Sequence, residues 1–264
     1  FRRTARAVQG ARCLRWTGRR RELRARDLDR ARPGGEEAAR AVPPGLDRAV
    51  AGKLRVQPAL SVCQNADIAC AGAGGCGHGA TWRPKRRSAW ALRARDRGCV
   101  GVAYTYNEPL VGYEYVRDVG RLASEAGLAN VLVSNGMVNE EPLTELLGIV
   151  DAANIDLKGF TQGFYDTAGG DLSAVKRTIE TLAADPTCHL EVTTLVIPGL
   201  NDDPDEIDAA AAWLASLDPA IPYHLTRFFP CHRMLDRPPT PVSALHALAD
   251  VARRHLSDVL LGNC

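Results

Sequence analysis

Polar side chains follow five apolar stretches of this chain, each at the point where the stretch ends. One such group alone is typical of an ordinary turn or loop start. Five in succession favour a ligand site, because carboxylate, amide, hydroxyl and cationic groups can together bind a polar small molecule. The groups are Asn107-Glu108-Pro109, Ser134-Asn135-Gly136, Asp156 with Lys158, the loop over residues 198–202, and His224 with Arg227.

The apolar stretches themselves predict how these groups are positioned. They are rich in β-branched and aromatic residues, as buried parallel strands are, and helical segments separate them. Strands that alternate with single helices form right-handed βαβ units, and the carboxyl ends of their strands meet on one face of the sheet. We predict strands over residues 100–106, 130–136, 152–158, 189–197, 223–228 and 259–261, and helices over 89–95, 111–126, 140–150, 171–184, 204–217 and 241–255.

The predicted fold class is therefore α/β, and a partial or complete (β/α) barrel fits the pattern best. No unit carries a G-x-G-x-x-G fingerprint, which disfavours a dinucleotide-binding Rossmann domain. Because side chains alternate along a strand, Asp156 and Lys158 share one face. They could also be an ion pair that only lines the barrel.

The cysteines form one cluster. Eight cysteines in 264 residues are too few for a disulfide scaffold. In a reducing compartment, clustered cysteines are more often metal ligands or reactive thiols. Cys63, Cys70 and Cys76 are therefore candidate metal ligands.

The charge of the chain is divided unequally. Residues 1–97 contain 23 Lys and Arg against 8 Asp and Glu, whereas residues 98–264 contain 10 against 23. The basic part lacks the interleaved aromatic residues of a stacking platform, so we expect no nucleic-acid partner. No apolar run approaches the roughly 20 residues of a membrane span. With no secretory signal visible either, we expect a cytoplasmic protein without a membrane partner.

Residues 1–55 are rich in Arg, Ala, Gly and Pro and contain few large aliphatic side chains. Little apolar surface is available to offset the entropy of ordering, so we expect disorder or weak helix. Alternatively, this segment and residues 70–87 are translated out of frame, since misread GC-rich DNA yields this composition and the chain begins with Phe1. We therefore divide the chain into a basic, disordered or misframed segment over 1–55 and a barrel domain over 56–264.

Six short runs of this sequence resemble those of a known protein family. Their order and spacing over residues 88–263 are similar to those of radical S-adenosylmethionine (SAM) enzymes of the AmmeMemoRadiSam-system type, which are related to the pyruvate formate-lyase activating enzymes. The resemblance implies a partial (β/α) barrel that binds SAM and a 4Fe-4S cluster and generates a 5′-deoxyadenosyl radical. The runs are residues 101–109, 133–136, 151–158, 191–202, 226–230 and 236–241.

The resemblance also implies partners and site residues. It implies an external electron donor such as flavodoxin or ferredoxin, and a substrate that is unknown and could be a protein, as for a glycyl-radical activase. Glu108 is expected to bind the ammonium group of SAM, for which a carboxylate is the suitable partner. The implied cofactor-binding residues are Asn107, Glu108, Pro109, Ser134, Asn135, Asp156 and Lys158, with Val196, Ile197 and Pro198 near the adenine, and His224 and Arg227 are weaker candidates for substrate contacts.

The cluster loop departs from the family pattern. Three cysteines in a C-x3-C-x2-C loop hold the cluster in the family, and Cys63 matches the third of them. The first two positions are Val56 and Leu60, which offer no ligand atom. Cys70 and Cys76 remain weak candidates at a different spacing. The chain is thus interpreted either as a radical SAM enzyme or as a catalytically dead barrel, which is a binding protein or the product of a frameshifted gene.

Overall fold

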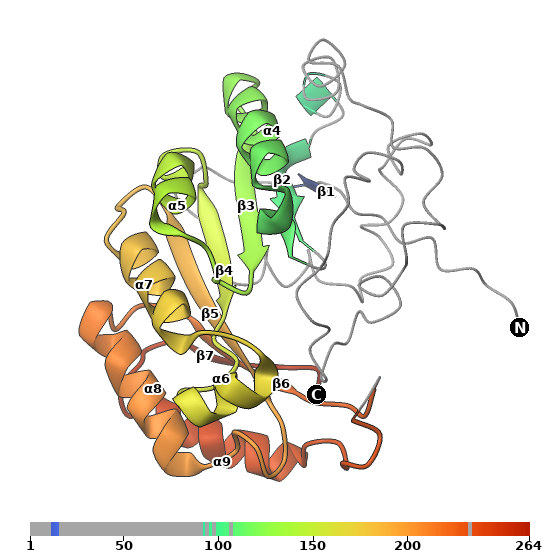
Figure 1. Cartoon of the computed structure of the whole chain (residues 1–264), viewed down its shortest axis with the longest axis vertical. Coiled ribbons are helices and arrows are strands. Elements are labelled where there is room, and N and C mark those ends of the chain that lie inside the picture. The colour runs from blue at the N-terminus through green and yellow to red at the C-terminus, as the bar shows by residue number, and fades with distance from the viewer. Residues whose placement is uncertain (1–11, 16–91, 93–94, 97–98, 106–107, 232–233) are drawn as a thin grey trace, which may run out of the picture. The chain divides into compact units, whose positions relative to one another are not determined.

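A computed structural model describes residues 12–15, 92, 95–96, 99–105, 108–231 and 234–264 (Figure 1). Contacts within the chain divide it into two units, one that ends at Leu132 and one that continues from there over Val133–Cys264. The boundary predicted at residue 55, the cysteine cluster and Asn107 lie outside the described residues. Of residues 1–55, only Arg12–Arg15 are described, as strand β1.

The first unit contains a helix held against two parallel strands. β2 (Cys99–Tyr104) pairs in parallel with β3 (Ala129–Ser134) and antiparallel with β1. A 3₁₀ turn, η2 (Pro109–Gly112), leads into α4 (Tyr113–Glu125), which buries Val116, Val119 and Ala123 at helical spacing. The buried Asn130 side chain accepts a hydrogen bond from Tyr104 Oη and donates to Gly120 O and Ser124 Oγ, so it fastens the helix to both strands.

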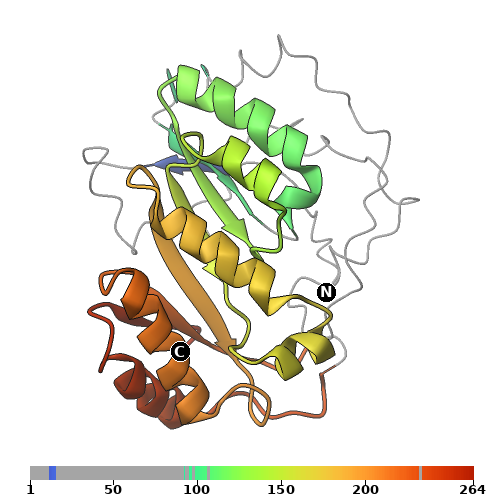
Figure 2. The same ribbon diagram turned by 60° about the vertical axis from the view of Figure 1, so that its left-hand side comes forward.

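The second unit is a series of parallel strands with connecting helices. β4 pairs with β5, β5 with β6 and β6 with β7, each in parallel. Figures 1 and 2 show α7, α8 and α9 along one side of these strands. The strands are β4 (Ala152–Asp156), β5 (His189–Val196), β6 (Tyr223–Arg227) and β7 (Val259–Gly262), and the helices are α5 (Glu140–Leu146), α6 (Gln162–Ala168), α7 (Leu172–Ala183), α8 (Pro204–Leu217) and α9 (Val242–Ala252).

The two faces of this sheet differ in chemistry. Thr194 and Tyr223 lie with Ile207 of α8, so their side of the strands is the face that packs on the helices. Successive side chains alternate between faces, so their sequence neighbours belong to the opposite face. We call that opposite face the polar face, and its residues are Asn154, Asp156, Glu191, Thr193, His224 and Thr226.

The predicted alternation of parallel strands and helices is confirmed from residue 99 onward. The predicted helix over 140–150 is shorter, since α5 ends at Leu146 and Gly148 adopts a φ of 75°. The described elements that were not predicted are β1, the 3₁₀ turn η2 and the short helix α6, which begins after the capping side chain of Thr161 and ends at Gly169 with a φ of 77°. Among the described residues, no helix combines the length and apolar character needed to cross a membrane.

Candidate functional site

The carboxyl end of β4 carries an ion pair. Lys158 Nζ lies 2.7 Å from Asp156 Oδ2, with exposed side-chain fractions of 22% and 31%. The pairing predicted from the strand period is therefore present. Both charged groups remain partly accessible, so a polar ligand can contact them where the strand ends.

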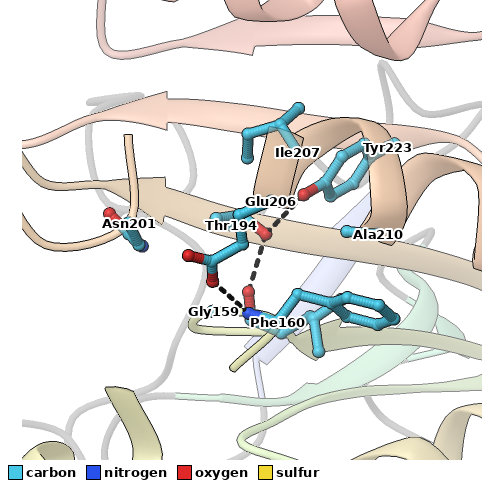
Figure 3. A pocket seen from close by; sticks show the side chains of 9 residues that line it. Gly159, Phe160, Thr194, Asn201, Glu206, Ile207, Ala210 and Tyr223 are labelled. Atoms are coloured by element: carbon cyan, nitrogen blue, oxygen red, sulfur yellow. Dashed lines mark hydrogen bonds between the residues drawn. The ribbon is translucent and has the colours of Figure 1, made fainter. Parts of the chain in front are cut away.

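The backbone after β4 is fixed by side chains from three other segments. Asn201 Nδ2 donates to Lys158 O at 2.6 Å, and Tyr165 Oη accepts from Lys158 N at 3.1 Å. Two residues further on, Glu206 Oε1 accepts from Phe160 N (Figure 3). These contacts place the Lys158 backbone independently of its side chain.

Asn201 also fixes the end of β5. Its Oδ1 accepts from Ile197 N at 2.7 Å and its Nδ2 donates to Leu195 O at 2.9 Å. The side chain is 1% exposed, so water cannot replace these bonds. The loop over residues 198–202 therefore works as a clasp between the ends of β4 and β5.

A small hollow behind this clasp is lined by residues of β5, β6, α8 and the loop after β4 (Figure 3). Thr194 Oγ1 lies 2.8 Å from Tyr223 Oη and donates to Leu157 O at 2.6 Å. Burial raises the pKa of both Tyr165 and Tyr223 far above the ordinary value, so both phenols stay protonated. The hollow supports the strand ends and offers no charged ligand group beyond Glu206.

The Ser134-Asn135-Gly136 segment forms a tight turn after β3. Ser134 Oγ accepts from Gly136 N at 3.1 Å, and Asn135 Oδ1 accepts from Met137 N at 2.8 Å. Gly136 has a φ of 73°, and a Cβ there would lie 2.8 Å from Ile155 Cγ2, so only glycine fits. The motif therefore forms a turn, and the Ser134 and Asn135 side chains are held at the end of β3.

Glu108 lies at the start of η2, in the first unit. Its Oε1 accepts from Leu110 N at 3.0 Å, and Pro109 occupies the first position of the turn. The carboxylate is therefore held beside a helical amino end rather than extended into solvent.

The two candidate substrate residues of β6 are separated by the pleat. His224 belongs to the polar face. Arg227 is three residues further along the strand, so its side chain lies on the opposite face, the one that packs on the helices. Arg227 Nε donates to Thr240 O at 2.7 Å, and its guanidinium stacks 4.8 Å from the ring centre of Phe229. The structure therefore does not bring His224 and Arg227 together on one face.

A cluster that sequence reasoning missed lies on the polar face. Glu191 Oε2 lies 2.8 Å from His224 Nε2, and its Oε1 lies 3.1 Å from His189 Nε2. Thr193 Oγ1 donates to Asn154 Oδ1 at 2.7 Å beside it. Polar residues at a period of two on three successive strands were the signal that could have revealed this cluster.

The Glu191 carboxyl group is ionised at neutral pH. Burial by itself would raise its pKa, but hydrogen bonds from His189 and His224, together with their charge, lower the pKa to about 2. A carboxylate that is fully buried and accepts hydrogen bonds from His189, His224 and Asn154 is stabilised as an anion.

We predict that Glu191→Gln flattens the acid dependence of stability. The folded-state pKa lies below the ordinary 4.5, so the contribution of the carboxylate is complete above about pH 4.5 and is lost as the pH falls toward 2. The slope difference should approach about 1.4 kcal/mol per pH unit between these values. Urea unfolding between pH 3 and 7 measures it, with Asp208→Asn, in a partly exposed pair with His255, as the control.

The described residues hold no group of three or more His, Cys, Asp and Glu side chains arranged for a metal ion. The described cysteines include Cys188 and Cys264, which are free. Burial raises the pKa of Cys188 to about 12, so this thiol is not a thiolate at neutral pH. Cys63, Cys70 and Cys76 lie outside the described residues.

Comparison with known proteins defines the class. The family model described as the Radical SAM superfamily matches residues 63–213, which is more than half of the chain, and the chain belongs to this superfamily. The predicted resemblance and the predicted partial (β/α) barrel of the radical SAM type are therefore confirmed.

One curated protein of similar sequence matches part of the chain. The chain is 36% identical over 167 residues to the Uncharacterized protein MJ0808 of Methanocaldococcus jannaschii, across 62% of this chain and 49% of that protein. It thus spans about half the length of this curated relative.

Two solved structures show the same fold. A domain of pyruvate-formate lyase-activating enzyme from Bacteroides vulgatus superposes with a TM-score of 0.53 at 20% identity, covering 62% of this chain and 99% of that one. Streptococcus suis SuiB bound to S-adenosylmethionine gives 0.55 at 10% identity, covering 71% and 45%. At these identities the likeness concerns the fold alone.

Proposed function

We propose that this chain is the barrel of a radical SAM enzyme and binds SAM at the carboxyl ends of its strands. The observation that carries the proposal is the superfamily match over residues 63–213. That range contains the strand ends after β2, β3, β4 and β5, where the polar motifs stand. Superfamily membership supports radical chemistry with SAM.

Within the second unit, the proposed ligand contacts are Lys158 and Asp156. An ammonium group has three donors, and the bond to Asp156 uses one of them. The other donors of Lys158 can bind the carboxylate of the methionine part of SAM, while Asp156 keeps the ammonium aligned. Ser134 and Asn135, at the end of β3, are proposed to contact the methionine or the ribose, and Val196, Ile197 and Pro198 the adenine.

Within the first unit, Glu108 is the proposed partner of the cofactor's ammonium group, with Asn107 and Pro109 beside it. The bond that Glu108 accepts from Leu110 N fixes the direction of its carboxylate. A carboxylate held in this way loses less conformational entropy when a ligand binds.

The residue types at the cluster positions do not fit a 4Fe-4S cluster. Such a cluster is held by cysteine thiolates, and Val56 and Leu60 stand where two of the three are required. We therefore assign no catalytic step to the chain as written.

The finer parts of the proposal concern the physiological context. A glycyl-radical activase is the proposed subclass, with a protein as substrate and flavodoxin or ferredoxin as electron donor. His224 is proposed to lie on the substrate side, because it belongs to the polar face. A cytoplasmic location is part of the same proposal.

A second candidate function is a barrel that retains the SAM pocket without redox chemistry. Val56 and Leu60 favour it, since they remove two cluster ligands. Sequencing the DNA upstream of the Cys63 codon separates the candidates. A second reading frame that encodes two cysteines at positions 56 and 60 supports the enzyme, and its absence supports the binding protein.

We predict that Glu108→Gln weakens SAM binding in the variant Val56→Cys/Leu60→Cys, which restores the cysteine loop. Glutamine keeps the acceptor for Leu110 N but removes the charge. Loss of one charge-assisted hydrogen bond costs about 1.5 to 3 kcal/mol, or roughly 10- to 150-fold in affinity. Isothermal titration calorimetry with SAM measures the change.

Glu114→Gln is the matched control, because Glu114 is an exposed carboxylate in the first turn of the following helix. It should leave the affinity unchanged. Equal affinities of the restored protein and its Glu108→Gln form would remove Glu108 from the site.

A further inference from the structure

Three titratable side chains on β5 and β6 are hydrogen-bonded in series. His189 Nε2 lies 3.1 Å from Glu191 Oε1, and Glu191 Oε2 lies 2.8 Å from His224 Nε2. The exposed side-chain fraction is 36% for His189, 0% for Glu191 and 2% for His224. The series therefore begins at a side chain that solvent reaches and ends at one that it does not.

The ionised carboxylate fixes the direction of these hydrogen bonds. It can only accept, so each imidazole donates its Nε2–H to one oxygen of Glu191. The Nδ1 atom of each ring is then the position that takes up a further proton. Among the described residues, His224 Nδ1 makes no hydrogen bond with protein groups.

Within the part of the chain that the structure describes, few other charged groups act on this series. The charges that act on Glu191 are those of His224 and His189. Asn154 of β4 faces the carboxylate without a titratable group, with its Nδ2 3.5 Å from Glu191 Oε2. Asp156 of β4 lies one step further along the polar face and pairs with Lys158. β7, which pairs with the other side of β6, has no titratable side chain.

We propose that His189, Glu191 and His224 form a proton relay between solvent, at the amino end of β5, and the buried polar face beside His224. The relay allows a group bound at the polar face to lose or gain a proton without opening of the sheet. Its use in a reaction rests on the proposed function, whereas the relay itself does not.

The proton balance is closed. A proton that arrives at His224 Nδ1 makes this ring an imidazolium, which passes its Nε2 proton to Glu191 Oε2. The protonated carboxyl group then rotates so that its O–H faces His189, whose exposed ring has exchanged with water to the tautomer protonated at Nδ1, and His189 Nε2 accepts the proton. His189 releases its Nδ1 proton to water, so one proton enters and one leaves, and no group is oxidised or reduced. His224 is left as the Nδ1–H tautomer, and passage of a proton in the opposite direction restores its Nε2–H.

The test measures hydrogen exchange of the His224 ring Nε2–H by NMR in the full chain labelled with ¹⁵N-histidine, without SAM. His189→Gln keeps a donor for Glu191 but cannot carry a proton. We expect His224 ring exchange to slow by about tenfold or more in this variant, because exchange then depends on rare local opening of the sheet. Glu191→Gln, which interrupts the series at its centre, should slow it similarly.

A purely structural role predicts the opposite sign. Loss of a buried hydrogen bond loosens the strands, so exchange of the His224 ring would be unchanged or faster in both variants, and either result overturns the relay. His246→Gln, at an exposed position of α9, is the control and should not alter the rate. If Glu191→Gln fails to fold, the partly exposed His189→Gln variant still decides the question.

The test of the proton relay and the test of the proposed function can fail independently. The relay is measured without cofactor, whereas the proposed function is tested by the effect of Glu108→Gln on SAM affinity. Unchanged exchange with a loss of SAM affinity would remove only the relay, and slowed exchange with equal SAM affinities would remove only the proposed cofactor contact.

Discussion

Reconstituted anaerobically with iron and sulfide, the chain as written is expected to retain far less than one 4Fe-4S cluster per molecule. Cys63 alone stands at a ligand position of the family loop, and the side chains of Val56 and Leu60 have no donor atom. One thiolate cannot hold a cluster against loss to solvent thiols, because several converging Fe–S bonds are required. Iron and sulfide analysis, together with absorbance of the thiolate-to-iron charge-transfer band, measures the content.

The double variant Val56→Cys/Leu60→Cys is the matched comparison, since it restores the C-x3-C-x2-C spacing with Cys63. It should retain about one cluster per chain. A stable charge-transfer band in the chain as written, lost on Cys70→Ser or Cys76→Ser, would show instead that the cysteine cluster at the unusual spacing binds the metal.

Asn201→Ala is expected to destabilise the fold by about 2 to 4 kcal/mol, because a buried backbone group left unpaired costs about 1 to 3 kcal/mol. The substitution removes the partners of Lys158 O, Leu195 O and Ile197 N at once. Urea unfolding measures the change in the free energy of unfolding. Because the clasp joins the ends of β4 and β5, the variant should also displace Lys158 from its position.

The neighbouring Asp202→Ala is the control. Asp202 Oδ1 accepts one hydrogen bond from Gly199 N in the same loop, at a more exposed place. Its loss should cost less than about 1 kcal/mol, because water can replace an exposed partner. Equal destabilisation by the two substitutions would contradict the clasp and indicate that the loop acts only through its own conformation.

Much of the fold follows from local patterns in the chain. β-branched runs such as residues 189–196 and amphipathic segments such as α4 and α7 are fixed by which side chains must leave water, and this information is local. Capping residues could have revealed α6 as well, since Thr161 precedes it and Gly169 follows it. β1 could not be predicted, because an edge strand of four residues depends on pairing with β2, which is distant in sequence.

The features of the candidate site also divide into those that the sequence predicts and those that depend on tertiary contacts. The sequence by itself determined that polar groups follow five of the strands, that Asp156 and Lys158 share a face, and that Val and Leu stand at positions 56 and 60, where the family resemblance implies two cluster ligands. Only the tertiary structure decided that Asn201 ties together the ends of β4 and β5 and that His224 and Arg227 belong to opposite faces. It alone joined His189, Glu191 and His224 into one series. The physical reason is that the Asn201–Lys158 and Glu191–His224 contacts connect residues 43 and 33 positions apart, which pair only when the register of adjacent strands is set by packing of the whole sheet.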